Sequence, residues 1–319
     1  MINCLVLLVV LSCILAIYIR KATQNAILDE VNDRSSHQIP VVRGGGIIFP
    51  ISMLVATIIY GNVMPYWSLL GLIALTITSF LDDFYGIRAS VRLLVQLVAN
   101  VLLVLAINQM VPLPIWANAI IVFVLTGFVN AFNFMDGING ITGLYSGVIL
   151  LGLYYLNQKL MFVNDEYITF PLTALIVFLY FNYRKIAKCF AGDVGSITIA
   201  FWILMLLSLL VIQTRDTRFV LMLSVYGIDT FFTLILRALN KENIFKAHRK
   251  HLYQLLSNEV GIDQRIVAFI YAAIQGLLFI PLFAYQLSLT MNLIIIGLLA
   301  VIYLILKMSI YKKYYGTLY

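Results

Sequence analysis

The fold is decided by an uncharged run, ITIAFWILMLLSLLVI at residues 197–212. A run of this kind approaches the length that an α-helix needs to cross the hydrocarbon of a lipid bilayer. Similar runs recur along the chain, so that 62% of its 319 residues are hydrophobic and 11% are charged. Soluble domains are nearer half apolar and a quarter charged. The composition therefore indicates an integral membrane protein and argues against two soluble domains.

We predict an all-α polytopic membrane protein with about eleven transmembrane helices in a single domain, residues 1–319. Helices are expected because lipid offers no partner for backbone polar groups. The first run is expected to be a retained helix, because Arg20 and Lys21 follow it rather than precede it as in a signal peptide. The predicted spans are 2–19, 46–62, 67–81, 91–110, 115–131, 141–156, 168–182, 197–212, 219–236, 266–287 and 292–310.

Lysine and arginine are divided unequally between the two alternating sets of loops. One set of loops holds three basic residues, Lys159, Arg215 and Arg218. The remaining 18 of the 21 basic residues lie in or beside the second set, called the basic set below. Such an excess marks cytoplasmic loops, so we expect the N-terminus outside and the C-terminus inside. The same rule explains the net charge of +7 without nucleic-acid binding. The basic set comprises loops 20–45, 82–90, 132–140, 183–196 and 237–265, and the C-terminal tail.

Carboxylates, glycines and histidines gather in these same basic loops, although the charge rule does not require it. All three histidines lie there, as do Asp82-Asp83 and the glycine-rich segments 43–46, 136–140 and 192–196. We therefore expect the active surface at the cytoplasmic face. Each glycine-rich segment precedes an outward-running span, and helix N-termini with nearby glycine favour phosphate binding. A single such turn is more simply a chain reversal, but three on one face favour a phosphate site.

Adjacent carboxylates, Asp82 and Asp83, directly follow the apolar run 69–81. They are either solvated acids that end a helix or part of a magnesium site, since Mg²⁺ favours one or two carboxylates with phosphate oxygens. Asp136 and Asp193 are further candidates for that site. Asp229 falls inside a predicted span, where a carboxylate is a functional hypothesis by default. The alternative is that Asp229 pairs with a polar helix neighbour such as Asn or Tyr.

Two histidines are one helical turn apart in His248-Arg249-Lys250-His251. A zinc site would need more ligands than this loop offers. A clamp for phosphate explains the segment better, with both histidines on one helical face if the loop is helical. A basic loop near the membrane is the alternative, and it explains Arg249 and Lys250 but not the histidines.

At these residues the sequence resembles the polyprenyl-phosphate N-acetylhexosamine-1-phosphate transferases. The residues in these motifs are most similar to those of the branch that initiates O-antigen synthesis. Two departures stand out: Asn139 replaces an aspartate of the family, and Gly86 replaces the lysine of the peptidoglycan branch. The matching segments are Asp29-x-x-x-Asp-Arg-Ser-Ser-His37, Arg43-Gly-Gly-Gly46, Asp82-Asp83 with Arg92 and Gln96, Asn130-Ala-Phe-Asn133-Phe-Met-Asp136-Gly, Phe190-Ala-Gly-Asp193-Val-Gly-Ser196 and His248-Arg-x-His251-x-Tyr-Gln254.

The resemblance implies transfer of a HexNAc-1-phosphate from a UDP-sugar to undecaprenyl phosphate, with release of UMP, at the cytoplasmic side of a bacterial inner membrane. It implies Mg²⁺ as cofactor, with Mn²⁺ as an alternative, and leaves a homodimer open. Asp82 and Asp83 would be catalytic, and Asp136 and Asp193 would hold the metal. The implied substrate-binding residues are His37, Arg43, Asn130, Asn133, Asn139, His248, Arg249 and His251.

Two other functions compete with this prediction. A secondary transporter has a similar number of helices, but its site lies near the bilayer midplane between repeats, whereas these polar residues gather at one face. A non-catalytic membrane scaffold for polysaccharide assembly is the other, and absence of UMP release would favour it.

Overall fold

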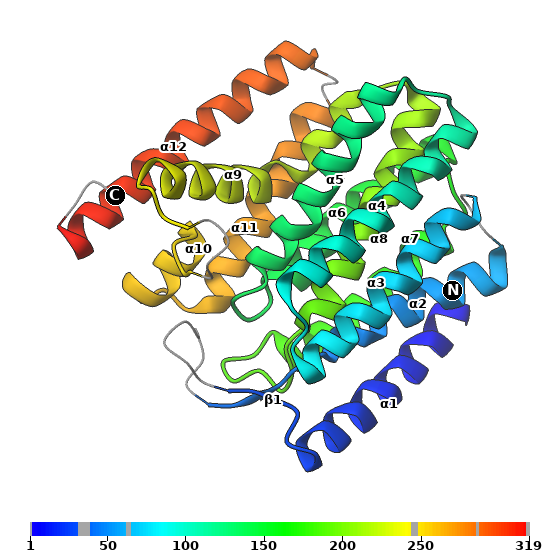
Figure 1. Ribbon diagram of the computed structural model, residues 1–319, viewed down its shortest axis with the longest axis horizontal. Coiled ribbons are helices and arrows are strands. Elements are labelled where there is room, and N and C mark those ends of the chain that lie inside the picture. Colours follow the sequence, from blue (N-terminus) through cyan, green and yellow to red (C-terminus); the bar gives the residue numbers. More distant parts are fainter. Residues whose placement is uncertain (1, 31–38, 62–64, 244–247, 285–286, 317–319) are drawn as a thin grey trace.

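Long α-helices lie side by side through most of the chain, and a small β-hairpin lies at one end of the bundle (Figure 1). The structure is a computed structural model, and it describes residues 2–30, 39–61, 65–243, 248–284 and 287–316. The predicted all-α polytopic class is confirmed. Within the described part of the chain, eight helices are long and apolar enough to cross a membrane.

A helix occupies each predicted span, although the number of membrane crossings and the sides of the termini stay predictions. The helices are α1 (Ile2–Gln24), α2 (Ile48–Tyr60), α3 (Tyr66–Tyr85), α4 (Ala89–Met110), α5 (Ile115–Met135), α6 (Ile141–Leu160), α7 (Glu166–Asn182), α8 (Gly192–Thr214), α9 (Ser224–Leu239), α10 (Leu252–Gln254), α11 (Gln264–Phe279) and α12 (Leu289–Tyr315). Shorter elements are the 3₁₀ helices η1 (Gly45–Ile47) and η2 (Thr217–Leu223), the π-helices η3 (Leu255–Glu259) and η4 (Ile280–Ala284), and the strands β1 (Leu28–Asp29) and β2 (Val41–Val42).

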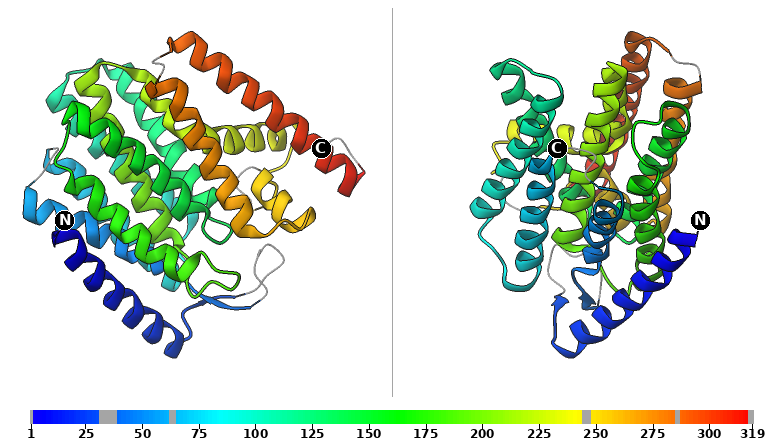
Figure 2. Two further views of the ribbon diagram at one scale, coloured as in Figure 1. Left: turned by 180° about the vertical axis from the view of Figure 1, so that it is seen from behind. Right: turned by 90° about the vertical axis from the view of Figure 1, so that its right-hand side faces the viewer.

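Helix α8 forms the centre of the bundle. Its most apolar stretch is 83% buried, whereas that of α12 is 11% buried. Helices α2, α3, α5 and α6 pack around α8, and α1 and α12 lie at the edges (Figures 1 and 2). The outer helices expose large apolar side chains, Leu298 and Ile305 of α12 among them. Exposed apolar surface on this scale is expected of helices that face lipid rather than water.

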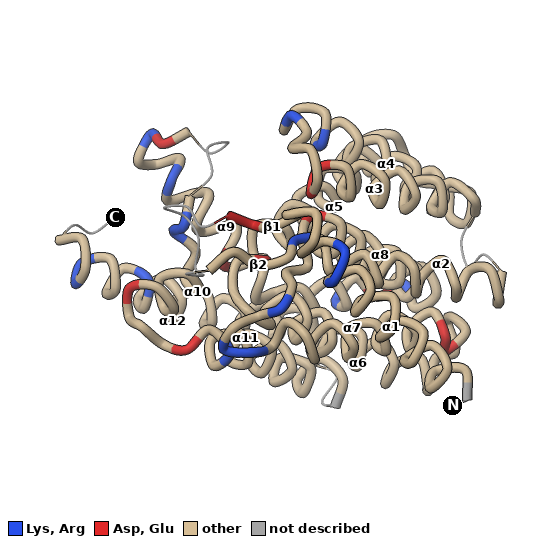
Figure 3. The backbone as a smooth tube through the Cα atoms, turned by 90° about the horizontal axis from the view of Figure 1, so that it is seen from below, with Lys and Arg blue, Asp and Glu red and all other residues tan. Residues whose placement is uncertain are grey.

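The predicted cytoplasmic loops 20–45 and 183–196 meet at one end of the bundle. Strands β1 and β2 pair antiparallel, and Val42 forms a bridge with Cys189. Cys189 is buried and, like Cys4 and Cys13, carries a free thiol. We call this end the polar end: it carries the β-hairpin, the N-terminus of α8 and the C-termini of α3 and α5. Figure 3 views it from below and shows acidic segments at and beside β1 among basic ones.

Several helices extend further into the polar end than the apolar runs predicted. Helix α3 continues to Tyr85, so Asp82 and Asp83 lie in its last turn rather than in a loop. Helix α5 continues to Met135 and therefore includes Asn133 as well as Asn130, which the predicted span already contained. Helix α8 begins at Gly192, which places Asp193 in its first turn. The predicted boundaries were wrong here because polar side chains that bond to a neighbouring helix need no loop to reach water.

An apolar cavity of about 420 Å³ opens at the opposite end of the bundle. It lies between the C-terminal parts of α4 and α8, the N-terminal half of α5, and η2, with Phe128, Leu207 and Val220 in its wall. Its lining is almost wholly hydrocarbon and, although it includes Arg215, contains no carboxylate that could bind a metal ion. The candidate site is therefore sought at the polar end.

Candidate active site

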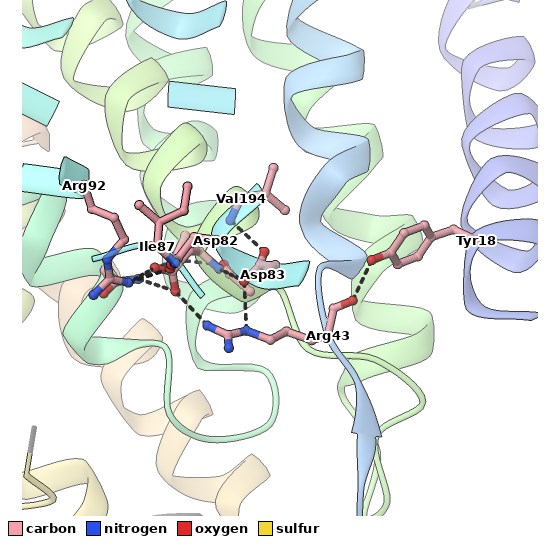
Figure 4. Close-up of polar contacts among 11 residues, drawn as sticks. Tyr18, Arg43, Asp82, Asp83, Ile87, Arg92 and Val194 are labelled. Atoms are coloured by element: carbon pink, nitrogen blue, oxygen red, sulfur yellow. Dashed lines mark hydrogen bonds and ion pairs between the residues drawn. The ribbon is translucent and has the colours of Figure 1, made fainter. Parts of the chain in front are cut away.

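Asp83 links the C-terminal end of α3 to the N-terminal end of α8 through hydrogen bonds. Its Oδ1 accepts a hydrogen bond from the amide of Asp193 at 2.9 Å, and its Oδ2 accepts one from the amide of Val194 at 3.1 Å (Figure 4). The first amides of a helix have no partner within the helix, and its dipole favours a negative charge there. The Asp83 side chain has no exposed surface. Asp83 thus supplies the anion that the N-terminus of α8 would otherwise take from a ligand.

Two arginines approach the carboxylates from opposite sides (Figure 4). Arg43 Nε lies 2.8 Å from Asp83 Oδ1, and its Nη2 lies 3.3 Å from Asp193 Oδ1. Arg92 Nη1 lies 2.7 Å from Asp82 Oδ2 and 2.5 Å from Asp193 Oδ2. The other Asp82 oxygen accepts from the amide of Ile87 at 2.5 Å. Five charged groups from four segments are thus linked, with one more carboxylate than guanidinium.

The convergence on Arg92 is the main feature of this cluster. Asp82 and Asp193 direct one oxygen each at the same guanidinium nitrogen, so both carboxylates face one point between α3 and α8. Arg92 Nε, in contrast, is buried and has no hydrogen-bond partner within the described residues. Buried donors are normally paired, so this atom is a donor that the described side chains leave unused.

Amides on α5 extend the cluster. Asn133 donates to Asp193 Oδ1 at 3.1 Å and to Ser196 Oγ at 3.2 Å. Asn130 donates to Gln96 Oε1 at 2.8 Å. Since both asparagines lie on one face of α5 at helical spacing, the helix presents them together toward α4 and α8. Their spacing in the sequence follows from this arrangement.

Asp136 immediately follows α5 at the polar end and differs from the other acids. It is partly exposed, and it forms no ion pair with any residue that the structure describes. Burial of its carboxyl group raises the pKa of Asp136 to about 7. A divalent cation would bind the ionised form of this carboxyl, in which the ion replaces the proton.

The three glycine-rich turns do not form open phosphate cradles, contrary to the prediction. The amides of Gly45 and Gly46 donate to the carbonyls of Phe190 and Ala191. The amide of Gly140 donates to Asn182 Oδ1 at 2.6 Å. The third turn is occupied by Asp83, as described above. Glycine is needed for close packing instead: a Cβ at Gly46 would lie 2.3 Å from the Cα of a glycine in α8.

The histidine segment is not helical where the two histidines would share a helical face, so that expectation is wrong. His248 lies in an irregular stretch, and His251 is the N-cap residue of α10. The rings nevertheless stack, with centroids 5.0 Å apart. Burial and the neighbouring His251 lower the pKa of His248 to about 3, so this ring is neutral. His251 Nδ1 lies 3.1 Å from Asp229 Oδ1 inside the protein.

The remaining predicted residues are less closely grouped. Asn139 is buried, and its amide donates to the carbonyl of Arg184 at 2.8 Å, which fixes the loop after α7. Arg249 is exposed at the surface of the polar end. His37 lies outside the described residues. None of the proposed roles is tested by position alone, and they remain predictions.

Some residues with evident roles in the cluster were not among the predicted site residues. Arg92 and Gln96 face the acids and amides from the first turns of α4, and both lie downstream of Asp82-Asp83 at helical spacing. Lys307, assigned to the cytoplasmic tail, is instead fully buried within α12. A lone lysine late in an apolar helix is a signal that the sequence did contain.

The carboxylates fit a magnesium ion in their chemistry. Hard carboxylate oxygens suit Mg²⁺, which typically takes one or two protein carboxylates and completes its shell with water and phosphate oxygens. No three His, Cys, Asp or Glu side chains within the described residues converge as a complete metal-binding group. Asp193, with Asp82 facing the same point and Asp136 nearby at the end of α5, is the donor set that an ion could share with substrate.

Comparison with known proteins agrees with this site. Residues 66–212 match the model of glycosyl transferase family 4, a range that includes the three segments bearing Asp82, Asp136 and Asp193. A probable undecaprenyl-phosphate N-acetylglucosaminyl 1-phosphate transferase of Bacillus subtilis (strain 168) is 25% identical over 271 residues, which cover 77% of this chain and 74% of that protein. An undecaprenyl-phosphate alpha-N-acetylglucosaminyl 1-phosphate transferase of Thermotoga maritima is 25% identical, with 79% of each chain covered.

A phospho-N-acetylmuramoyl-pentapeptide-transferase of Wolbachia pipientis wMel is 29% identical over 230 residues, which cover 63% of this chain and 69% of that protein. The matched family model and these relatives agree with the family resemblance that the motifs predicted. The chain is a multi-pass membrane protein, and the relatives that it resembles are named as transferases of phosphosugars.

Proposed function

We propose that the protein transfers a HexNAc-1-phosphate from a UDP-sugar to undecaprenyl phosphate and releases UMP. The observation that carries the proposal is the convergence of Asp82 and Asp193 on Arg92, beside Asn133, at the end of an apolar bundle. An acidic cluster of this kind suits a nucleotide pyrophosphate that is bound through a divalent cation, and the surrounding apolar helices suit a lipid acceptor. The substrates named for the Bacillus and Thermotoga relatives support the same pair.

The reaction requires neutralisation of the negative charge on the phosphates more than removal of a proton from the lipid phosphate. An oxygen of the lipid phosphate attacks the β-phosphorus of the UDP-sugar, a new P–O bond forms, and the bond to the oxygen of UMP breaks. A phosphate monoester is already largely ionised near pH 7, since its second pKa is about 6. The attacking oxygen therefore needs little help from a base, and positioning carries much of the catalysis.

Each residue of the cluster then has a definable task. Asp193 and Asp136 would hold Mg²⁺, and Asp82, which faces the same point as Asp193, would orient the incoming phosphate or the ion's water. The bound ion would neutralise the pyrophosphate, as phosphoryl transfer requires. Arg43 and Arg92 bridge the carboxylates and keep two positive charges at the site.

The substrate-binding roles remain those that the resemblance implied. Asn130 and Asn133 would bind the nucleotide or its phosphates from α5, and Arg249 offers an exposed planar fork for a phosphate. His248 and His251 would contact the phosphate or the sugar. Asp83, whose oxygens already serve the N-terminus of α8, would act chiefly by holding Asp193 in place.

The cellular setting is part of the proposal. The basic loops favour a cytoplasmic position for the polar end, and the enzyme would start a lipid-linked polysaccharide at a bacterial inner membrane. Initiation of O-antigen rather than another surface polymer rests on the resemblance of the motifs. Mn²⁺ would substitute for Mg²⁺ because it prefers similar oxygen ligands.

Turnover of a donor panel tests the proposal. Purified protein would be mixed with undecaprenyl phosphate, Mg²⁺ and, in parallel, UDP-GlcNAc, UDP-GalNAc or UDP-MurNAc-pentapeptide. UMP release with one of the first two donors is expected. Release that does not require the lipid phosphate would contradict the proposed acceptor. Absence of UMP release with every donor, from folded protein, would favour the scaffold or transporter alternatives.

A further inference from the structure

A second buried polar group lies beside the carboxylate cluster and centres on Asp229 of α9. The side chain is fully buried, and Oδ2 accepts from the hydroxyl of Tyr271 at 2.6 Å. Oδ1 accepts from the amide of Leu252 at 3.2 Å and from the hydroxyl of Tyr303 at 3.0 Å. Burial of a carboxylate is costly unless its oxygen atoms accept hydrogen bonds. Asp229 therefore joins α9, α10, α11 and α12 around one carboxylate.

The geometry fixes which nitrogen of His251 carries a proton. His251 Nδ1 lies 3.1 Å from Asp229 Oδ1. An ionised carboxylate accepts hydrogen bonds and donates none, so Nδ1 must carry the hydrogen and donate it. The next histidine is held in the opposite way, because His248 Nδ1 accepts from the amide of Lys250 at 3.2 Å. The two stacked rings thus hold different tautomers.

The other nitrogen of His251 has no protein partner among the described residues. Nε2 is buried, and the whole residue is 2% exposed. A buried ring nitrogen without a partner is unusual, because buried polar atoms are normally hydrogen-bonded. The missing partner of Nε2 is explained if a bound molecule supplies it.

His251 lies next to the end of α5 that carries Asp136. Its ring centroid is 6.4 Å from that of Phe134, two residues before Asp136. Tyr253 fixes this placement, since its hydroxyl donates to the carbonyl of Phe134 at 2.9 Å. Gly137 leaves the space that Tyr253 occupies, because a Cβ there would lie 2.2 Å from the tyrosine oxygen. The histidine is thus docked against the predicted metal-binding segment.

Helix α12 supplies the positive charge that this buried carboxylate requires. Lys307 has no exposed surface, and its Nζ lies 2.5 Å from Thr233 Oγ1 and 2.9 Å from the Tyr303 hydroxyl. Both hydroxyls in turn bond to Asp229 Oδ1. A buried charge is stable when it is paired and hydrogen-bonded. Lys307 is therefore linked to the Asp229 carboxylate through two intervening hydroxyl groups and adds a positive charge beside it.

We propose that Asp229 is a positioning residue, which holds His251 with Nδ1–H toward α9, so that Nε2 takes up a second proton when the anionic donor binds and donates it to a phosphate oxygen of the nucleotide-sugar. The inference rests on the proposed function for the identity of the ligand, but the orientation of the ring does not. Lys307 and Tyr303 take part in this positioning, because they stabilise the charge of the Asp229 carboxylate and fix its position. A carboxylate that accepts from Nδ1–H orients the ring and also stabilises its doubly protonated form, in which Nε2 is a donor.

Nitrogen NMR tests the ring orientation without any turnover. The chain contains three histidines, so ¹⁵N-histidine labelling gives three imidazoles, which His37→Gln, His248→Gln and His251→Gln assign. We expect Nδ1 of His251 to be protonated and Nδ1 of His248 to be unprotonated. Addition of UDP with Mg²⁺ should shift Nε2 of His251, and uridine, which lacks the phosphates, should not. An unprotonated Nδ1 at His251, or equal effects of UDP and uridine, would overturn the proposal.

A double-mutant cycle tests whether Asp229 acts through the histidine. Asp229→Asn should lower kcat/KM about 10- to 100-fold, the usual effect of losing an orienting partner. Combined with His251→Gln, it should cause no further loss beyond that of His251→Gln alone. Asp216→Asn removes a carboxylate that pairs with Arg218 away from this site, and it should leave activity unchanged.

Losses that multiply in the double variant would show that Asp229 acts independently of His251. If Asp229→Asn does not fold, the NMR result on the unsubstituted protein decides the matter. If the unsubstituted enzyme releases no UMP with any donor, the proposed function fails, while the protonation of His251 Nδ1 still tests the orientation.

Discussion

Replacement of Asp83 by asparagine separates a structural role from a catalytic one. Three donors converge on this carboxylate: the amides of Asp193 and Val194, and Nε of Arg43. Asparagine keeps the size of the side chain but offers one acceptor oxygen and an NH₂ group in place of the other. That NH₂ group would face a donor, and one amide of α8 would lose its partner.

The expected cost follows from these contacts. A buried donor left without a partner costs about 1–3 kcal/mol. Removing one partner of a buried ion pair costs about 3–5 kcal/mol, but Arg43 is partly exposed and keeps Asp193, so its share is smaller. We therefore expect Asp83→Asn to lower the free energy of unfolding by about 3 kcal/mol. At roughly 2–4 °C per kcal/mol for a medium-sized domain, Tm should fall by about 6–12 °C.

Thermal unfolding of the purified protein in detergent, followed by intrinsic fluorescence, measures this change. Asp136→Asn is the matched control, because it removes a carboxylate that forms no ion pair within the described part of the chain. Its Tm should match that of the unsubstituted protein. If Asp83→Asn keeps the original Tm and yet has no activity, Asp83 acts directly on substrate and the capping argument is wrong.

Four further outcomes are expected. Asp136→Asn should abolish turnover or strongly raise the Mg²⁺ concentration required, and full activity with unchanged Mg²⁺ dependence in a titration would exclude it as a metal ligand. Arg249→Lys should reduce turnover because lysine cannot form the two parallel contacts of a guanidinium with phosphate, and a silent substitution in the same assay would leave this residue as a surface cation. Gly46→Ala should lower the yield of folded protein, because its Cβ would lie 2.3 Å from a backbone carbon in α8; normal yield and Tm would show that the helices can separate. Reporter fusions should give a cytoplasmic signal at Tyr319 and an external one within 157–167, and the reverse pattern would remove the argument for a cytoplasmic active face.

The helical architecture was predictable because long uncharged runs have few alternatives in lipid. The run 197–212 is an example, since it corresponds to the most buried part of the bundle. The ends of the helices were less predictable. Hydropathy ends a span at the first charged residue, whereas Asp82 and Asp83 remain helical because Arg92 and the amides of α8 satisfy them. Such partners are distant in the sequence, so a local pattern does not reveal them.

The grouping of the acids at one end was also predictable, because alternating spans bring alternate loops to one face. The partners were not. Three glycine-rich turns on one face suggested a phosphate site, yet amides in these turns donate to protein oxygens, including those of Asp83. A local motif specifies that a helix begins, but it does not specify whether a ligand or a side chain of another helix fills its N-terminus.

The contacts of Asp229 also could be predicted only in part from the sequence. Its position within an apolar run marked it as unusual, and the alternative that it pairs with tyrosine was correct as far as Tyr271 and Tyr303 are concerned. Its contact with His251, 22 residues away, depends on the path of the chain after α9. The spacing of residues within one helix cannot predict such a contact.

Position-specific labelling of the donor tests the proposed reaction most directly. The enzyme would be supplied with undecaprenyl phosphate, Mg²⁺ and the UDP-HexNAc that it turns over, labelled with ³²P at either the α- or the β-phosphorus. If the lipid phosphate attacks the β-phosphorus, the β label appears in the lipid product and the α label appears in UMP. If both labels leave together as UDP, the protein transfers the sugar without its phosphate, and the reaction proposed for the Asp82–Asp193 cluster is wrong.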